Sequence, residues 1–463
     1  MKNLIPYSNR VKKVWIFKQK TIFSILFLSL VCTILVGGRG MFALDERITK
    51  SIKVSWFKSS SREEKDFNKY SKLIQKDKNY IIHASSNKDM EYFYRSLDSL
   101  SNHLRKKVSI IHIGDSHVQA DAFPGKLREN LQKDSLFGNG GRGLIFPHSM
   151  TRSNNALSVK VSYNGVWVGC KNAEWGKSCN WGLSGVIAST QDIRAGFTIN
   201  PNTLSPVDYP ITKVKVFYPV DDPTSFNVKI NSIETEVKSK TINIKGGYVE
   251  FLLTSPIKEV SIGFEKTSDL QKNFTLQGIS LEDDNPGIIY HSSGINGVDT
   301  YGYLRTPFLE QHISALKPDL IIISLGTNDA YTRRFDPQGF KRNYGTLLQR
   351  VKRASPNASI LLTTPGDCLL YRHYPNVNNA VAGKIIKELA EEMECSVWDF
   401  YAVMGGIKSI NVWFSNGLAL SDKLHFNGKG YSLQGDLLYD AVIKDYVEFS
   451  SKHPLQKIEI TGR

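Results

Sequence analysis

The chain has 463 residues, of which 41% are hydrophobic and 22% charged, so it is long enough for two or three domains with cores of their own. Its formal net charge of +15 suits an anionic neighbourhood such as a membrane face, a nucleic acid or an acidic polymer. Because no nucleic-acid-binding motif occurs, we expect no nucleic-acid partner.

The N-terminus predicts export. Residues 1–20 form a basic head without an acidic residue, and an uncharged, mostly apolar run follows over residues 21–38. The sequence Met41-Phe42-Ala43 matches a cleavage site poorly, which favours an uncleaved inner-membrane anchor over a cleaved signal that would release a secreted protein. With the head in the cytoplasm, the chain after residue 38 lies in the periplasm or otherwise outside the cytoplasm. Residues 39–102 are interpreted as a stalk and a first helix, or alternatively as an extension packed on the domain that follows.

The five cysteines fit an exported protein loosely. Cys32 lies in the predicted membrane segment, whereas Cys170 and Cys179 are close enough to close a small disulfide loop in an oxidising compartment. Pairing of Cys368 with Cys395 is less favoured. No Cys-x-x-Cys pair suggests zinc, and we expect neither a metal nor a cofactor.

A strand-turn-helix segment stands out near residue 116. The apolar run Val108 to Ile113 predicts a buried strand, which breaks at Gly114-Asp115-Ser116-His117, and a helix is expected over 121–131. A turn of this kind raises a hydroxyl out of the sheet with backbone N–H groups behind it, as a serine nucleophile requires. The alternative is an ordinary surface turn.

A glycine-rich stretch, Phe137 to Leu144, follows this helix. Gly138, Gly140 and Gly143 match the dinucleotide-binding pattern Gly-x-Gly-x-x-Gly. That pattern requires a strand before it and a helix after it, whereas here a helix precedes and Phe146-Pro147 follows. We interpret the stretch as a flexible loop beside the active site.

Helix signals nearly vanish between residues 151 and 284, and short alternating runs separated by turn residues predict an inserted all-β sandwich. Trp167, Trp175 and Trp181 cluster at its start and either stack on sugar rings or belong to the sandwich core. The expected strands are Leu157–Tyr163, Gly196–Ile199, Val214–Tyr218, Phe226–Ile230, Thr241–Ile244, Tyr248–Leu253 and Val260–Phe264.

Strands and helices alternate again over residues 285–450, before a tail at 451–463. This order predicts a parallel sheet covered by helices on both faces, the three-layer α/β class. Residues 103–150 and 285–450 then form one domain that the β segment interrupts. The expected strands are 288–290, 319–324, 359–363 and 396–400, and the expected helices 308–316, 339–353, 381–393 and 431–449.

Candidate catalytic residues lie at the ends of these strands. Reactive groups of an open α/β sheet gather at the carboxyl edge, where Ser116, Gly297 and Asn328 are expected. Asp422 and His425, three residues apart before the last helix, are suitable as orienting carboxylate and general base. The backbone N–H groups of Ser116 and Gly297 and the Asn328 amide form the candidate oxyanion hole. Supporting roles are expected for the neighbouring residues Asp115, His117 and Asn296.

These residues stand in four blocks: Gly-Asp-Ser-His at 114–117, Gly-Ile-Asn-Gly at 294–297, Gly-Thr-Asn-Asp at 326–329 and Asp-Lys-Leu-His at 422–425. The block pattern resembles the SGNH (GDSL-type) hydrolases over roughly residues 105–150 and 285–445. The resemblance implies a nucleophilic serine at 116, a base at 425 and its orienting carboxylate at 422. It also implies an oxyanion hole that includes 297 and 328.

A closer resemblance is to bacterial peptidoglycan O-acetylesterases, on account of Gly-Asp-Ser-His, the glycine-rich stretch, the inserted β segment and Gly-Ile-Asn-Gly. The resemblance implies an insert similar to a carbohydrate-binding module. It also implies an O-acetylated glycan substrate, in that family the acetylated 6-hydroxyl of N-acetylmuramic acid.

The leading hypothesis is therefore a serine carbohydrate esterase that acts on O-acetyl groups outside the cytoplasm. A glycan O-acetyltransferase would use the same residues, with a sugar hydroxyl in place of water. A lipase or thioesterase predicts a broad apolar groove, whereas the insert offers Trp and polar loops. A non-catalytic glycan-binding protein is least favoured, because it does not need all four blocks together.

Overall fold

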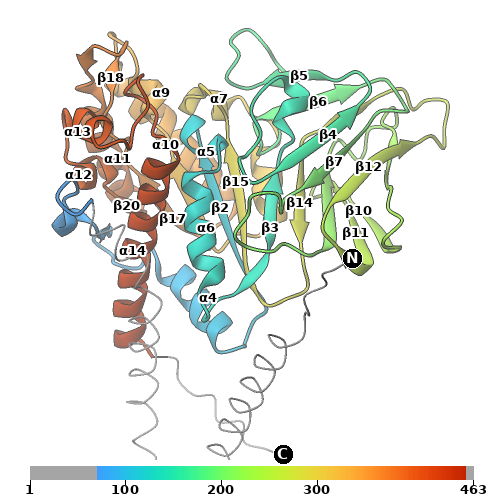
Figure 1. Cartoon of the computed structure of the whole chain (residues 1–463), viewed down its shortest axis with the longest axis horizontal. Helices are drawn as coiled ribbons and strands as arrows, with labels where there is room; N and C mark the ends of the chain where they lie inside the picture. Colours follow the sequence, from blue (N-terminus) through green and yellow to red (C-terminus); the bar gives the residue numbers. More distant parts are fainter. Residues whose placement is uncertain (1–69, 455–463) are drawn as a thin grey trace, which may run out of the picture. The chain divides into compact units, whose positions relative to one another are not determined.

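The computed structural model describes residues 70–454, which are built on one sheet of eleven strands (Figure 1). Six neighbouring strands are parallel, and the strands beyond them at either end are antiparallel. In spatial order the strands are β1 (Ile81–Ile82), β20 (Ser396–Trp398), β17 (Ser359–Thr363), β16 (Leu320–Ser324), β2 (Lys107–Gly114), β15 (Gly287–Gly294), β3 (Asn139–Ile145), β14 (Gly278–Glu282), β8 (Ile211–Phe217), β11 (Tyr248–Ile257) and β10 (Val237–Asn243).

Helices cover both faces of the parallel half, as the sequence predicts. In Figure 1, α6 (Phe123–Lys133) and α14 (Gly428–Lys452) lie in front of these strands, and α10 (Pro337–Ala354) and α11 (Asn378–Glu392) lie behind. The remaining helices are α4 (Glu91–Ser101), α5 (Ser116–Gln119), α7 (Thr300–Leu304), α8 (Leu309–Leu316), α9 (Thr327–Ala330), α12 (Phe400–Met404), α13 (Ser409–Ser415), η1 (Lys76–Lys78) and η2 (His148–Thr151).

The predicted basic head, the membrane segment at 21–38 and residues 39–69 of the predicted stalk lie outside the described residues. Within 70–454, no helix is both long enough and apolar enough to span a bilayer. The described end of residues 39–102 packs on the α/β part, because β1 pairs with β20 at the edge of the sheet and Phe93 of α4 donates its N–H to Ser359 Oγ.

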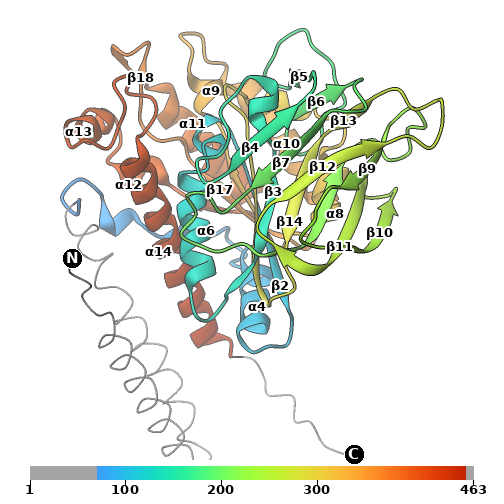
Figure 2. The same ribbon diagram turned by 45° about the vertical axis from the view of Figure 1, so that its right-hand side comes forward.

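Residues 152–284 contain strands and no helix, as expected (Figure 2). One small sheet has the order β4 (Lys160–Asn164), β7 (Gly196–Asn200), β12 (Val260–Glu265) and β9 (Asn227–Ile230), and another β13 (Phe274–Leu276), β6 (Val186–Thr190) and β5 (Val168–Lys171). A hairpin of β18 (Leu369–Leu370) and β19 (Tyr374–Pro375) lies outside this region.

The β region is not a detached sandwich. Its strands β8, β10, β11 and β14 extend the central sheet, because β14 pairs with β3. The four-stranded sheet shares a hydrophobic core with them: Ile199 of β7 and Val216 of β8 belong to the same cluster as Ile111 of β2. The described residues accordingly form one compact unit.

The glycine-rich stretch is a buried strand, β3, and our interpretation of it as a flexible loop was wrong. Its glycines allow neighbouring backbones to approach closely. A Cβ on Gly143 would lie 2.5 Å from the Tyr290 carbonyl oxygen, and one on Gly141 would lie 2.6 Å from the Glu282 Cα. Glycine is therefore required for β3 to fit between β15 and β14.

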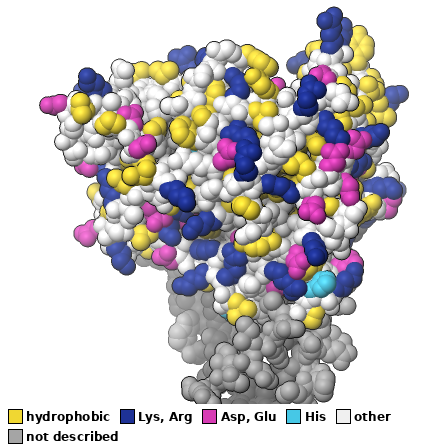
Figure 3. All heavy atoms as spheres, turned by 180° about the vertical axis from the view of Figure 1, so that it is seen from behind, with side chains coloured by type: hydrophobic (Ala, Val, Ile, Leu, Met, Phe, Trp, Pro, Cys, Tyr) yellow, Lys and Arg dark blue, Asp and Glu magenta, His cyan; other side chains and the backbone are white. Residues whose placement is uncertain are grey.

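Lys and Arg side chains are spread over the face shown in Figure 3, among acidic and apolar ones. They do not gather in one patch on this face. This face therefore presents no concentrated basic patch.

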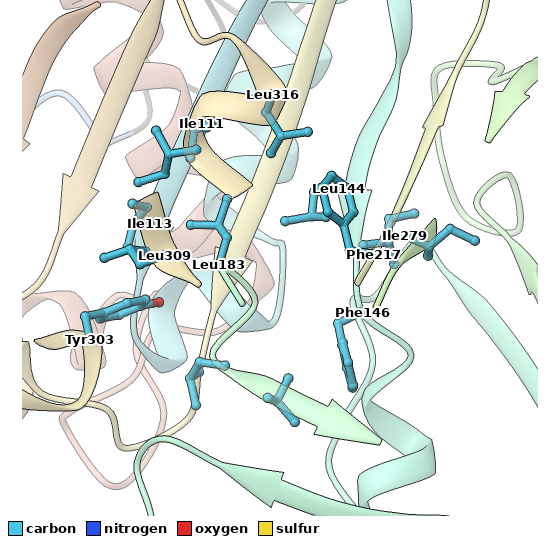
Figure 4. Close-up of a cluster of buried hydrophobic side chains, with 14 of the residues drawn as sticks. Ile111, Ile113, Leu144, Phe146, Leu183, Phe217, Ile279, Tyr303, Leu309 and Leu316 are labelled. Carbon is cyan, nitrogen blue, oxygen red and sulfur yellow. The ribbon is translucent and has the colours of Figure 1, made fainter. Parts of the chain in front are cut away.

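The main core runs from the parallel strands into the β region (Figure 4). Ile111 and Ile113 of β2 point toward Leu309 and Leu316 of α8, and Phe217 of β8 lies beyond Leu144. All of these side chains are at least 95% buried. The strand β2, which precedes Ser116, thus belongs to a core that includes side chains from both the α/β part and the inserted β region.

Candidate active site

Ser116 is the first residue of α5, directly beyond the carboxyl end of β2. The preceding Asp115 caps this helix, its carboxylate accepting the His117 N–H. A Cβ on Gly114 would lie 2.3 Å from Val118 Cγ2, so glycine allows the chain to turn tightly from strand to helix. The tight turn places the half-buried Ser116 side chain at the sheet edge.

The structure brings Ser116, His425 and Asp422 together, although 309 residues separate the serine from the histidine. Ser116 Oγ lies 3.0 Å from His425 Nε2, and His425 Nδ1 lies 2.8 Å from Asp422 Oδ2. Asp422 also accepts the backbone N–H groups of Leu424 and His425, each at 3.0 Å. These bonds fix the loop that carries the histidine.

The hydrogen bonds around Asp422 favour the ionised form of its carboxyl group. Burial by itself would raise the pKa of Asp422, but hydrogen bonds from His425 and the two backbone N–H groups lower it below its usual value. An ionised Asp422 accepts a hydrogen bond from the His425 Nδ1–H, which leaves Nε2 free to accept the Ser116 hydroxyl proton.

A second histidine, His117, lies against the first. Its ring stacks on that of His425, with centroids 5.3 Å apart and planes inclined by 28°. Its Nδ1 lies 2.9 Å from Asp115 Oδ1 and its Nε2 lies 3.3 Å from the Leu424 carbonyl oxygen. Burial would lower the pKa of His117, but the Asp115 carboxylate raises it above the usual value. Both partners of the ring are hydrogen-bond acceptors, an arrangement that favours the doubly protonated form of His117.

The loop after β15 carries Gly297 to the same edge. Gly297 has a positive φ of 79° and open space around it, and the neighbouring Asn296 is exposed. The Asn296 N–H donates to Gln119 Oε1 at 2.7 Å, which ties the loop to α5. The Asn296 side chain is therefore free for contacts outside the chain, while its backbone positions the loop.

Asn328 reaches the site but uses its amide within the protein. Its Nδ2 donates to the Val298 carbonyl oxygen at 2.9 Å and lies 3.4 Å from Asp115 Oδ2. Both of its hydrogens are thus directed at protein acceptors, and the shorter bond holds the residue next to Gly297. To donate to a substrate, Asn328 must give up its longer contact with Asp115.

Several supporting residues were not predicted. Gln119 holds the Gly297 loop, Tyr303 donates its hydroxyl to the Gly114 carbonyl oxygen at 2.8 Å, and Asp329 accepts the Thr300 hydroxyl at 2.6 Å. Only Asp329 stood in a recognisable block. The others act through contacts between distant segments, which no local pattern reveals.

The predicted disulfide between Cys170 and Cys179 is present, while Cys368 and Cys395 are free and buried. The three tryptophans differ in role. Trp181 is 1% exposed and packs against the disulfide, and Trp167 packs on Phe197 and Phe264. Trp175 alone among them is largely exposed, at 75%.

Comparison with protein families gives one match. Residues 272–433 match the GDSL-like Lipase/Acylhydrolase family. The chain carries a domain of this family. The expected resemblance and the expected enzyme class, a hydrolase of ester bonds, are thereby confirmed, and the GDSL-like domain includes Asn328, Asp422 and His425.

A comparison with solved structures finds a similarity that covers more of the chain than the GDSL-like domain does. One described as a peptidoglycan O-acetylesterase is 21% identical, with a TM-score of 0.66, and the match covers 77% of this chain and 96% of that one. This match shows that the two share a fold over most of the described residues. A comparison with curated proteins found no match.

Two further structures match only about a third of the chain. A lipase/acylhydrolase from Enterococcus faecalis is 24% identical with a TM-score of 0.28, and the match covers 34% of this chain and 77% of that one. An acetylxylan esterase from Geobacillus stearothermophilus is 21% identical, also with a TM-score of 0.28, over 35% and 73% of the two chains.

Proposed function

We propose that this protein is an exported serine carbohydrate esterase that removes O-acetyl groups from an envelope glycan, with peptidoglycan as its substrate. The observation that carries the proposal is the continuous chain of hydrogen bonds from Ser116 Oγ through His425 to Asp422, at 3.0 Å and 2.8 Å. This geometry is what a hydroxyl needs to become a nucleophile.

In the first step, Ser116 Oγ forms a bond to the acetyl carbonyl carbon while its proton passes to His425 Nε2. The carbonyl π electrons move onto oxygen, and Asp422 stabilises the imidazolium that forms. When the tetrahedral intermediate collapses, the C–O bond to the sugar breaks. The sugar oxygen takes the proton from His425 and leaves as a hydroxyl, so that Ser116 carries the acetyl group.

In the second step, water replaces the sugar. His425 accepts a proton from the water as its oxygen attacks the acetyl carbon. The bond to Ser116 Oγ then breaks while His425 returns the proton to that oxygen, and acetic acid leaves and ionises to acetate. During both steps the N–H groups of Ser116 and Gly297 stabilise the oxyanion. Each donor of this kind typically lowers the barrier by about 3 kcal/mol. Asn328 maintains the position of the Gly297 loop through Val298 and supplies a third donor after leaving Asp115.

The substrate assignment draws on two observations. The solved structure that shares this fold over 77% of the chain is described as a peptidoglycan O-acetylesterase. The net charge of +15, of which residues 1–69 carry +9 (14 Lys and Arg against 5 Asp and Glu), favours an acidic polymer. Export is proposed from the basic head and apolar run at residues 1–38, and the Cys170–Cys179 disulfide is consistent with an oxidising compartment.

The test is acetate release by the purified full-length protein from O-acetylated peptidoglycan, acetylated xylan and p-nitrophenyl acetate, with Ser116→Ala as the control. Base-treated peptidoglycan, which has lost its O-acetyl groups, serves as the substrate blank. We expect the highest kcat/KM on O-acetylated peptidoglycan and no release by Ser116→Ala.

Hydrolysis of p-nitrophenyl acetate without release from either glycan would overturn the substrate class. Transfer of acetyl groups to an added glycan acceptor, in place of free acetate, would show a transferase that uses the same residues. Unchanged turnover by Ser116→Ala would refute the assigned nucleophile.

A further inference from the structure

Two clusters of exposed aromatic side chains, each with an arginine, lie on segments that follow the strands around Ser116. The first, here called the Trp175 platform, consists of Trp175, Tyr301 and Arg305. The rings of Trp175 and Tyr301 stack with centroids 5.5 Å apart and planes inclined by 17°. Arg305 Cζ lies 5.8 Å from each ring centroid. Trp175 is 75% and Tyr301 40% exposed, so a large aromatic surface faces solvent.

The Trp175 platform is held to the loop that carries Gly297. The Cys170–Cys179 disulfide closes the segment that bears Trp175. Arg305 donates to the Lys177 carbonyl oxygen at 3.0 Å and also to that of Asn172, which fastens this segment to the end of α7. Since α7 begins three residues after Gly297, the platform is anchored to the same segment as the candidate oxyanion hole.

The second cluster, here called the Tyr374 platform, consists of Tyr371, Tyr374 and Arg333. The two tyrosines lie on the β18–β19 hairpin and are 48% and 57% exposed. Arg333 Cζ lies 5.5 Å and 5.7 Å from their ring centroids. No ion pair joins Arg333 to another residue of the described chain, so its charge is available to a ligand.

This platform is also tied to the catalytic loops. The Leu369 N–H donates to the Lys423 carbonyl oxygen at 2.9 Å, which links the hairpin to the segment between Asp422 and His425. The Tyr371 N–H donates to the Tyr331 hydroxyl at 3.0 Å, which links it to the loop after β16.

The strand order places the platforms on opposite sides of Ser116. The sheet runs β17-β16-β2-β15, with all four strands parallel. Tyr301 follows β15, Ser116 follows β2, Arg333 follows β16 and Tyr374 follows β17. Figure 1 shows this sequence along one edge, from β18 and α9 on the left through α5 and α7 to β5 on the right. Because strands are about 4.8 Å apart, the strands that precede the two platforms lie about 10–14 Å apart, so a ligand that reaches both is longer than one sugar ring.

We propose that the two platforms are subsites for one acidic glycan chain, which lies across Ser116 with a sugar ring stacked on the aromatic side chains at each end. Pyranose rings present apolar C–H faces that pack on exposed aromatic rings, and the exposed Arg333 attracts carboxylates carried by the chain. This inference rests on the proposed function and deepens it, because it makes the substrate an extended anionic polymer.

The experiment compares Trp175→Ala, Tyr374→Ala and a matched control, Tyr92→Ala. Tyr92 lies on α4 and is 43% exposed. The neighbouring Phe93 donates its N–H to Ser359 Oγ at the start of β17, so Tyr92 lies near the amino edge of the sheet, opposite the edge that carries Ser116. The readout is the ratio of kcat/KM for O-acetylated peptidoglycan fragments to kcat/KM for p-nitrophenyl acetate. Fragments range from one disaccharide to several, and binding of the same fragments to Ser116→Ala protein is measured by calorimetry.

For the longer fragments we expect each platform variant to lower the ratio roughly tenfold, the upper range of one aromatic stacking contact. For a single disaccharide the loss should be smaller, since it cannot reach both platforms. The control should stay within twofold of wild type. Arg333→Gln should lower activity on acidic fragments more than on neutral acetylated xylan.

The outcomes separate the two proposals. If wild type deacetylates the fragments while Trp175→Ala and Tyr374→Ala match Tyr92→Ala at every length, the subsites are refuted and the esterase function stands. If wild type releases no acetate from glycans but Ser116→Ala binds them through Trp175, the subsites stand and the esterase function fails. If the protein neither binds nor deacetylates any fragment, both fail.

Discussion

His117 offers a prediction in which two hydrogen bonds of one ring have separate consequences. Its Nδ1 faces the Asp115 carboxylate at 2.9 Å, within the segment that carries the nucleophile candidate. Its Nε2 faces the Leu424 carbonyl oxygen at 3.3 Å, in the loop that carries His425. His117→Asn keeps a donor at the position of Nδ1 alone, and His117→Gln keeps one at the position of Nε2 alone.

The expected magnitudes follow from the two acceptors. The bond to Asp115 joins a cation and a carboxylate, and such bonds contribute about 1.5–3 kcal/mol to stability. The bond to Leu424 is longer and contributes about 0.5–1.5 kcal/mol. If the Leu424 bond maintains the 3.0 Å distance between Ser116 and His425, its loss appears in the barrier, where ~1.4 kcal/mol is a tenfold change in rate.

We therefore expect His117→Asn to lower kcat about three- to tenfold with a modest loss of stability. His117→Gln should keep kcat within about threefold but lower the unfolding midpoint by several degrees. The measurements are steady-state hydrolysis of p-nitrophenyl acetate and thermal unfolding. Equal kcat values for the two variants, or kcat lowered more by Gln than by Asn, would refute the assigned division.

Three further predictions concern the triad and a distant ion pair. Ser116→Ala should abolish acetate release without changing the unfolding midpoint, because its side chain packs little. Asp422→Asn should lower kcat by roughly 10²–10⁴-fold, since an amide favours the wrong His425 tautomer. Burial lowers the pKa of His83, but Asp445 and Asp89 outweigh burial and raise it to about 10. His83→Gln should therefore destabilise the fold fully below pH 6.5 and progressively less as pH rises toward 10.

Each of these has a distinct counter-result. Acetate release by Ser116→Ala would show that another residue is the nucleophile. An Asp422→Asn enzyme with near wild-type kcat would show that the carboxylate is dispensable. A destabilisation by His83→Gln that grows with pH, in thermal unfolding measured from pH 6 to 10, would contradict a cationic His83.

Much of the parallel half was predictable because its strands are continuous apolar runs that end at Gly, Asn or Pro. β2, β16 and β17 lie where the sequence places them. β3 was missed because its glycines resemble a loop, although the same glycines are needed for close contact with β15 and β14. The extension of the sheet by β14 depends on pairing with β3 across more than a hundred residues, which local periodicity does not encode.

The candidate active site was likewise predicted in part. Ser116, Asp422 and His425 were predicted from their blocks, and the structure brings them within hydrogen-bonding distance. The contacts of Asn328 with Val298 and Asp115 were not predicted, because a block shows a residue's type and not its acceptor. The sequence also did not show which of the three tryptophans is exposed, because the burial of Trp181 and Trp167 depends on contacts made only in the folded protein.

The hydrogen bonding of β14 to β3 has a practical consequence for anyone who dissects this protein. Deleting residues 151–284 would not release a separate module. The deletion would remove four strands from the sheet and make β3 an exposed edge strand. Its unpaired amide and carbonyl groups could then pair with another molecule. The region expected to bind the polymer and the region expected to deacetylate it therefore fold, and unfold, as one unit.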